Sequence, residues 1–169
     1  MKKYLLIIIL FISINSNGQN LKALDNKFGF REMQFGDTVS KFDDLVPVEY
    51  SNDSSSIFYR KTGDKLTIGS SEVEISYGFY KGHLYSIYIK TKGYENSRAL
   101  LKTLEEMYGK GYQRNEYIKE YSWYGKKVSL SYDENSINHN ATILMYSKES
   151  LNQQKKDEKE KAKKAKDDF

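Results

Sequence analysis

Apolar and polar residues alternate through the middle of the chain. Between Glu72 and Tyr80 the odd positions are apolar and the even ones are mostly Glu, Ser or Gly. A Lys-Gly turn follows, and apolar and polar residues alternate again over residues 83–91. Because successive side chains of a strand point to opposite faces, this pattern predicts two antiparallel strands with one buried and one hydrated face. Shorter runs predict further strands over residues 57–61, 65–68, 116–124, 127–132 and 141–147, the first two as a hairpin around Thr62–Asp64.

The helical period appears between Glu95 and Gly111. Leu100, Leu104 and Met107 follow one another at three- and four-residue steps, which predicts a helix over 96–108 with one apolar stripe. Asn96 or Ser97 is expected to cap its start and Gly109 to end it. Asp37 likewise predicts the start of a short helix over 38–45.

These elements predict a single α+β domain. We expect an antiparallel sheet of about six strands with the 38–45 and 96–108 helices on one face, in the order helix, meander, helix, meander. The domain should occupy residues 28–148, after a linker at 19–27. Residues 149–169 are rich in Lys, Glu and Asp without an apolar stripe, so this tail should be a hydrated helix or disordered.

The first eighteen residues have the pattern of a secretory signal. Lys2 and Lys3 precede an apolar run from Leu5 to Ile14, and small residues at Ser16 and Gly18 predict cleavage before Gln19. The run is too short for a bilayer about 30 Å thick, which takes about 20 residues of helix. We therefore expect an exported protein, periplasmic or secreted, with no membrane span after cleavage. The chain has no cysteine, so its stability must come from a packed core.

The net charge of +4 comes from the two ends of the chain. Between the signal and the tail, 18 basic residues face 18 acidic ones, so the body is neutral. That balance excludes the basic surface expected of a nucleic-acid-binding protein.

Candidate catalytic chemistry is sparse. His83 and His139, the two histidines, fall in predicted turns without a partner residue, and their spacing does not fit a zinc site. Glu72 and Glu74 share one face of a predicted strand, about 7 Å apart, where two carboxylates can bind a cation or act as an acid and base. The preferred explanation of the pair is a plain hydrated face with Lys90 as cross-strand partner. No cofactor is expected.

Tyrosine is the unusual component of the composition, with fifteen residues. Most should fill the sheet core, where the ring packs and the hydroxyl stays at the edge. Tyr80, Tyr88 and Tyr124 fall on faces predicted to be hydrated. Exposed tyrosines are enriched in recognition surfaces, because they offer a large contact area at low entropic cost.

Several short motifs occur together: F-R-x-x-x-F-G (Phe30 to Gly36), K-G-x-L-Y (Lys81 to Tyr85), W-x-G-K (Trp123 to Lys126) and a Lys/Glu-rich tail. In this combination the chain resembles small exported proteins of Gram-negative bacteria that carry no assigned function. The resemblance implies an α+β fold and brings no catalytic residue. The plan of helices and meanders is also similar to the beta-lactamase inhibitor protein and TATA-box-binding proteins, in architecture only.

The leading hypothesis is a non-enzymatic envelope protein that binds a protein or a cell-wall polymer. The open sheet face would carry the binding residues, which are Glu72, Glu74, Tyr88, Lys90 and Tyr124. The alternative is a hydrolase or cation-dependent enzyme that uses the paired carboxylates. In a third hypothesis the charged tail tethers the domain to an anionic surface.

Overall fold

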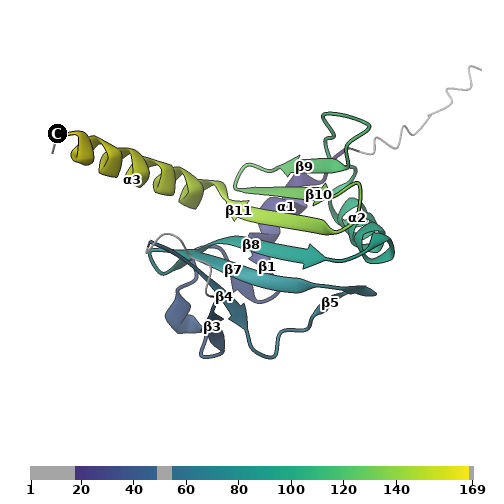
Figure 1. Cartoon of the computed structure of the whole chain (residues 1–169), viewed down its shortest axis with the longest axis horizontal. Coiled ribbons are helices and arrows are strands. Elements are labelled where there is room, and N and C mark those ends of the chain that lie inside the picture. The colour runs from purple at the N-terminus through teal and green to yellow at the C-terminus, as the bar shows by residue number, and fades with distance from the viewer. Residues whose placement is uncertain (1–17, 49–54, 168–169) are drawn as a thin grey trace, which may run out of the picture.

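A seven-stranded antiparallel sheet forms the centre of the protein (Figure 1). The computed structural model describes residues 18–48 and 55–167, so the signal predicted over 1–18 lies outside the described residues except for Gly18. The α+β class and the antiparallel sheet are confirmed. In spatial order the strands are β3 (Leu45–Pro47), β4 (Ser56–Lys61), β7 (Glu74–Tyr80), β8 (His83–Thr91), β11 (Ala141–Ser147), β10 (Val128–Glu134) and β9 (Glu120–Tyr124).

The sheet consists of two meanders that meet at its middle. The first runs from β3 to β8, and helix α2 (Tyr94–Tyr108) then carries the chain to the far edge, where β9 begins. The second meander returns inward, so that the last strand, β11, pairs with β8. Ile89 lies opposite Ile143 in that pairing, and Ile87 lies opposite Met145. Residues that are more than fifty positions apart in the chain thus form the centre of the core.

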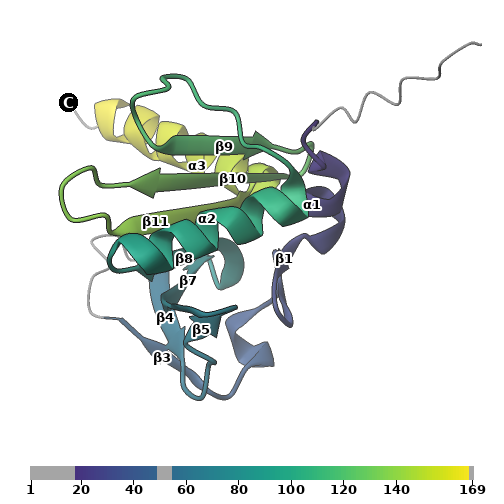
Figure 2. The same ribbon diagram turned by 90° about the vertical axis from the view of Figure 1, so that its right-hand side faces the viewer.

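Helix α2 buries its apolar stripe against this centre. Leu100, Leu104 and Tyr108 are all at most 7% exposed and belong to the same hydrophobic cluster as the inward residues of the sheet. Figure 2 shows α2 lying across the sheet with α1 beside it. The helix starts earlier than expected, after Gly93, so Asn96 and Ser97 lie inside its first turns. Gly109 ends it with a φ of 75°, as its position predicted.

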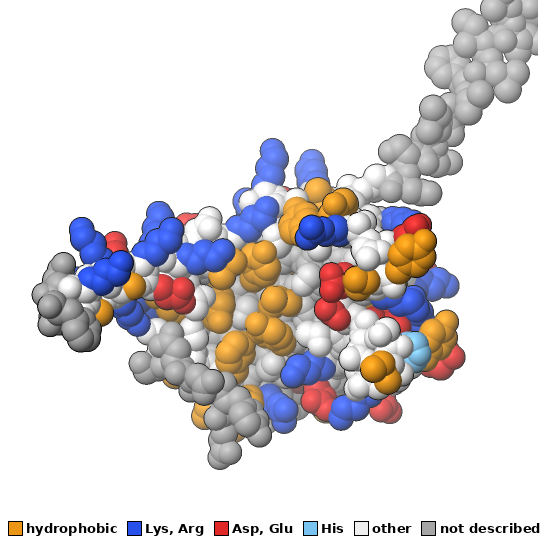
Figure 3. Space-filling view, turned by 45° about the horizontal axis from the view of Figure 1, so that its top comes forward, with side chains coloured by type: hydrophobic (Ala, Val, Ile, Leu, Met, Phe, Trp, Pro, Cys, Tyr) orange, Lys and Arg blue, Asp and Glu red, His pale blue; other side chains and the backbone are white. Residues whose placement is uncertain are grey.

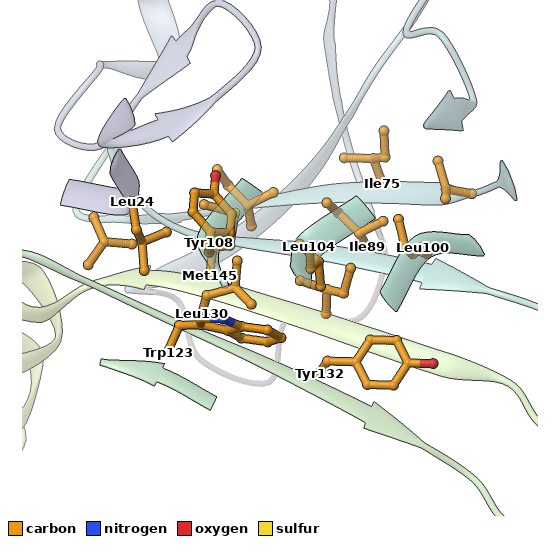
Figure 4. Packing of buried hydrophobic residues seen from close by; sticks show 14 of the residues in the cluster. Leu24, Ile75, Ile89, Leu100, Leu104, Tyr108, Trp123, Leu130, Tyr132 and Met145 are labelled. Atoms are coloured by element: carbon orange, nitrogen blue, oxygen red, sulfur yellow. The ribbon is translucent and has the colours of Figure 1, made fainter. Parts of the chain in front are cut away.

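Large aromatic side chains complete the core under α2 (Figure 4). Trp123 and Tyr132 have no exposed surface. The indole Nε1 of Trp123 donates to the carbonyl of Gly109 at 2.8 Å, so this buried donor is satisfied at the point where the helix ends. Trp123 therefore connects the C-terminus of α2 to the edge strand β9.

The predicted linker at 19–27 is a helix, α1 (Leu21–Lys27), that packs into the core. Its Leu24 is fully buried, and the Asn20 side chain caps its first turn by accepting from the N–H of Ala23. Two turns of helix with a single fully buried leucine carry too little periodicity to be recognised in a sequence. The described helices on the α2 side of the sheet are thus α1 and α2.

The predicted helix over 38–45 is a single 3-10 turn at Val39–Lys41. The Val39 N–H at the start of this turn donates to the carbonyl of Gly82, and the backbone becomes extended at Phe42, which ends the turn. Leu45–Pro47 then becomes the edge strand β3, where pairing with β4 supplies the hydrogen bonds that a helix would have made.

One strand pairing and two strand boundaries also differ from the prediction. The residues expected to pair with 57–61 instead form β5 (Thr67–Ile68), which pairs with β6 (Ser71–Glu72) in a small separate sheet. Val73 interrupts the expected strand over 72–80, so that β7 begins at Glu74. A further small sheet joins β1 (Gly29–Phe30) to β2 (Met33–Gln34), and β9 begins at Glu120 rather than at residue 116.

The charged tail is helical over α3 (Lys148–Asp167), which projects from the end of β11 beyond the sheet (Figure 1). Asp157 fixes it to the β7–β8 turn, because its carboxylate accepts from the Tyr80 hydroxyl at 2.7 Å and pairs with Lys81 at 2.6 Å. The ion pair with Lys81, followed by the bonds from Tyr80 and Gln153, lowers the pKa of Asp157 to about 2.

One carboxylate joins α1 to the second meander. Asp25 accepts from the backbone N–H groups of Lys126, Lys127 and Val128, at 2.7, 2.8 and 3.0 Å. Burial raises the pKa of Asp25, but these donors together outweigh it and leave the pKa below its ordinary value. Asp25 therefore stabilises the β9–β10 turn in its ionised form.

We predict that Asp25→Ala lowers the free energy of unfolding by about 1–3 kcal/mol, because three turn N–H groups lose their acceptor. Urea denaturation measures this, with Asn26→Ala, on the exposed side of α1, as the control. A pKa lowered by folding contributes stability above about pH 4, the usual range of a free Asp, and loses it as the pH falls through the folded pKa. The difference in the free energy of unfolding between wild type and Asp25→Asn should therefore become smaller below about pH 4. If this difference stayed the same down to the lowest pH at which the protein folds, Asp25 would not have this role.

We also predict that NMR titration of the Asp157 carboxyl group gives a midpoint near 2. Lys81→Ala should move the midpoint up toward about 3.9, the value of an unpaired Asp, whereas Lys126→Ala should not. Because the pKa is lowered on docking, α3 should be held firmly above about pH 4 and released as the pH falls toward the folded pKa. A wild-type midpoint close to 4 would show that α3 is not docked through Asp157.

Candidate functional site

The sheet face opposite α2 carries residues in three rows of different chemistry. Along β7 and β8, Gly78 lies opposite Ser86, Ser76 opposite Tyr88, and Glu74 opposite Lys90. On β11 the rows continue with Tyr146, Leu144 and Thr142. Figure 3 shows hydrophobic side chains gathered in the middle of this face, with charged groups along its borders. The face thus changes from aromatic to charged along the strands.

An aromatic hollow of about 280 Å³ lies on this face at β4, β7 and β8. The rings of Phe58 and Tyr88 form its apolar part and meet edge to face with centroids 5.5 Å apart. Gly78 makes room for the Phe58 ring, because a Cβ there would lie 2.8 Å from that ring and 2.2 Å from Ser86 Oγ. Arg60, Glu74 and Lys90 surround the rings. Burial, followed by the nearby Tyr85, raises the pKa of Tyr88, so its hydroxyl stays protonated.

A second, polar hollow of about 650 Å³ lies on the other side of Glu74 and Lys90. The β5–β6 hairpin, the start of β11 and the first turn of α2 enclose it, and Glu72 and Lys92 contribute charged groups. Lys92 pairs with Glu74 at 3.1 Å, and this bond is the main reason why the pKa of Glu74 is lowered. Glu74 and Lys90 therefore form a ridge between the two hollows.

The structure brings together four of the five residues predicted for this surface. Glu72 and Glu74 belong to β6 and β7 rather than to one strand, yet both line the polar hollow, as does Lys90. Tyr88 lies in the aromatic hollow next to them. Tyr124 lies on β9, and β10 and β11 separate it from β8. Three strand spacings amount to about 14 Å, so Tyr124 does not belong to this site.

The paired carboxylates are poorly arranged for acid–base catalysis. A general acid needs a pKa raised toward the working pH, whereas Lys92 lowers the pKa of Glu74 and keeps it ionised. Within residues 18–48 and 55–167 no three His, Asp or Glu side chains are placed to hold a metal ion. The two hollows offer charged and aromatic contacts instead.

A buried ionic cluster surrounds Glu134, the last residue of β10. The prediction from the sequence did not include it. Glu134 has no exposed side-chain surface, and its carboxylate lies 3.2 Å from Arg98, 3.6 Å from Lys119 and 3.1 Å from Nδ1 of His139. The Tyr132 hydroxyl, whose pKa is raised by burial and then by Glu134, lies 2.8 Å from its other oxygen.

The cluster fixes the loop between β10 and β11 to the start of α2. His139 was predicted to lie in a turn without a partner residue, but its ring contacts Glu134 and packs edge to face on Tyr94, with a centroid distance of 5.3 Å. Ser97 Oγ donates to the His139 carbonyl at 2.6 Å. Contacts of this kind, which join the loop to the rest of the fold, indicate a structural role. No sequence signal points to the cluster, because its members come from four separate segments.

Comparisons with known proteins give no relative. The chain matches no protein-family model, and no significant match is found among curated proteins or solved structures. None of the helices within the described ranges combines the length and the apolar composition that a bilayer span requires.

We predict that Glu134→Ala destabilises the fold by about 2–4 kcal/mol, because it removes the shared acceptor of a buried network. Glu134→Gln should cost less, since its amide oxygen can still accept from Tyr132. Thermal and urea unfolding measure both variants, with Glu120→Ala on the exposed edge strand as the control. If Glu134→Ala unfolded like the wild type, the cluster would not anchor the loop.

Proposed function

We propose that the protein is an exported, non-enzymatic binding module whose partner docks on the aromatic hollow and the Glu74–Lys90 ridge. One observation carries the proposal: the Phe58–Tyr88 ring pair lies half-buried between charged residues of both signs. Interfaces concentrate binding energy in such arrangements, where an aromatic anchor is surrounded by polar groups that exclude water.

The charge pattern favours a protein as the partner. Arg60, Lys90 and Lys92 are cationic, whereas Glu72 and Glu74 are anionic, so neither sign dominates. A polyanionic wall polymer would be attracted by an excess of basic residues, which this surface lacks. A protein surface can offer both signs together with an apolar side chain for the hollow.

One feature of the sequence supports export. The first eighteen residues have the basic, apolar and small-residue order of a secretory signal. A partner should accordingly be sought in the cell envelope.

We predict that Tyr88→Ser and Lys90→Glu each reduce the amount of a specific envelope protein retained by the immobilised chain at least tenfold. Tyr88→Ser removes the anchor, and losses of about 2 kcal/mol or more are usual for such residues. Lys90→Glu reverses the charge of an exposed side chain and leaves the core unchanged. Mass spectrometry after a salt wash identifies what is retained, and thermal unfolding confirms that both variants fold.

The matched controls are Tyr117→Ser and Lys126→Glu, exposed positions outside both hollows. If all four variants retained the same proteins as the wild type, this surface would not be the binding site. Retention of a glycan in place of a protein would show that the partner is a wall polymer.

A further inference from the structure

An apolar pocket of about 230 Å³ lies on the opposite side of the sheet, between α2 and the inner face. Its floor is formed by Ile89, Leu130, Ile143 and Met145, from three neighbouring strands. Figure 4 shows Leu104 and Tyr108 of α2 above Met145 and Leu130. We call this space the α2 pocket. It is separate from the two hollows, which lie on the outer face of the sheet.

The pocket is an opening beside a packed core. Its floor residues are at most 3% exposed, so the free space lies between them, the rim at Met107 and the strands β1 and β5. Water gains little in such a space, because it needs two or more polar partners and the floor offers none. An apolar cavity of about 150 Å³ is enough to bind benzene. The α2 pocket therefore has room for an apolar group somewhat larger than a benzene ring.

The wall on the helix side is open and adaptable. Met107 is 49% exposed at the rim of the pocket, although it follows the apolar stripe of α2. Methionine has a flexible, unbranched side chain that adjusts to irregular ligands, and Met145 supplies a second one in the floor. Phe30 and Ile68 form the facing wall from β1 and β5. Both of these strands are only two residues long.

One cation at the rim of the pocket is available to an anionic group. Arg31 is already occupied, because it pairs with Asp64 at 2.6 Å and also donates to the carbonyl of Thr67. Lys27 has one hydrogen bond, to the carbonyl of Arg31 at 3.0 Å. No carboxylate within the described residues lies in ion-pair range of Lys27. Its ammonium group has three donors and can therefore receive an anionic group at the rim.

We propose that the α2 pocket binds the hydrocarbon chain of a small amphiphile, with the anionic head group held at Lys27. The occupant is a single chain of the length of a medium-chain fatty acid, and it inserts between α2 and the sheet while its carboxylate remains at the surface.

The test titrates straight-chain carboxylates from butanoate to dodecanoate into the full chain by calorimetry. Each added methylene that enters the pocket should tighten binding about fourfold. The gain should stop once the chain exceeds the pocket, because further carbons remain in water. Binding that does not depend on chain length, or no binding of octanoate at millimolar concentration, would overturn the proposal.

Two variants block the pocket from different walls. Met107→Trp places an indole at the rim, and Ile68→Phe narrows the space from β5. Each should weaken octanoate binding more than tenfold while the protein still unfolds cooperatively. Lys102→Trp, on the exposed side of the same helix, is the control and should bind like the wild type. Equal binding by wild type and both blocking variants would place the ligand elsewhere and overturn the proposal.

The head-group assignment has its own readout. Octanoate should bind about fivefold more tightly than octanol, the effect of one ion pair near the surface. Lys27→Ala should abolish this preference and leave octanol binding unchanged, whereas Lys22→Ala, on the same helix, should preserve it. If octanol bound as tightly as octanoate to the wild type, the role of Lys27 would be refuted.

Discussion

The pairing of β8 with β11 is the interaction on which the rest of the structure depends. It joins two meanders whose strands lie about fifty residues apart in the chain, from Thr91 opposite Ala141 to Ser86 opposite Tyr146. Helix α2 can bury its stripe only when both halves are present, because Ile89 of β8 and Ile143 of β11 lie under it together. Closing such a long loop costs entropy before any contact is gained. The burial of α2 is what offsets that cost.

The fold was predictable where its signal is local. The alternation over β7 and β8 and the period of α2 are properties of short stretches, and each reports the environment of its own residues. The position of β11 in the middle of the sheet has no local signal, since it results from the path of α2 to the far edge. Helix α1 is missed for a related reason: Leu24 is fully buried, but two turns are too short to establish a period.

The same distinction explains the predicted site. Glu74, Tyr88 and Lys90 come together because they lie on adjacent strands joined by a tight turn, which fixes their register. Tyr124 lies on the predicted face of the sheet, but its strand is not adjacent to the site. The order of strands in a sheet cannot be deduced from the alternation of apolar and polar residues. The cluster around Glu134 could not be predicted from the sequence, because Arg98, Lys119 and His139 come close to Glu134 only once α2 lies across the sheet.

The side chains of successive residues in the central strands point to opposite faces of the sheet. Tyr88 points into the aromatic hollow, whereas Ile89 lies in the floor of the α2 pocket. On β11, Leu144 likewise lies on the outer face opposite Tyr88, whereas Ile143 lies in the floor of the α2 pocket. A ligand on either face that binds only the folded chain stabilises it by mass action. Coupling between the two faces would require the paired strands to have a second arrangement, and a register slip would turn every buried side chain outward. The central pairing that holds the two halves together therefore also assigns each side chain of these strands to its face of the sheet.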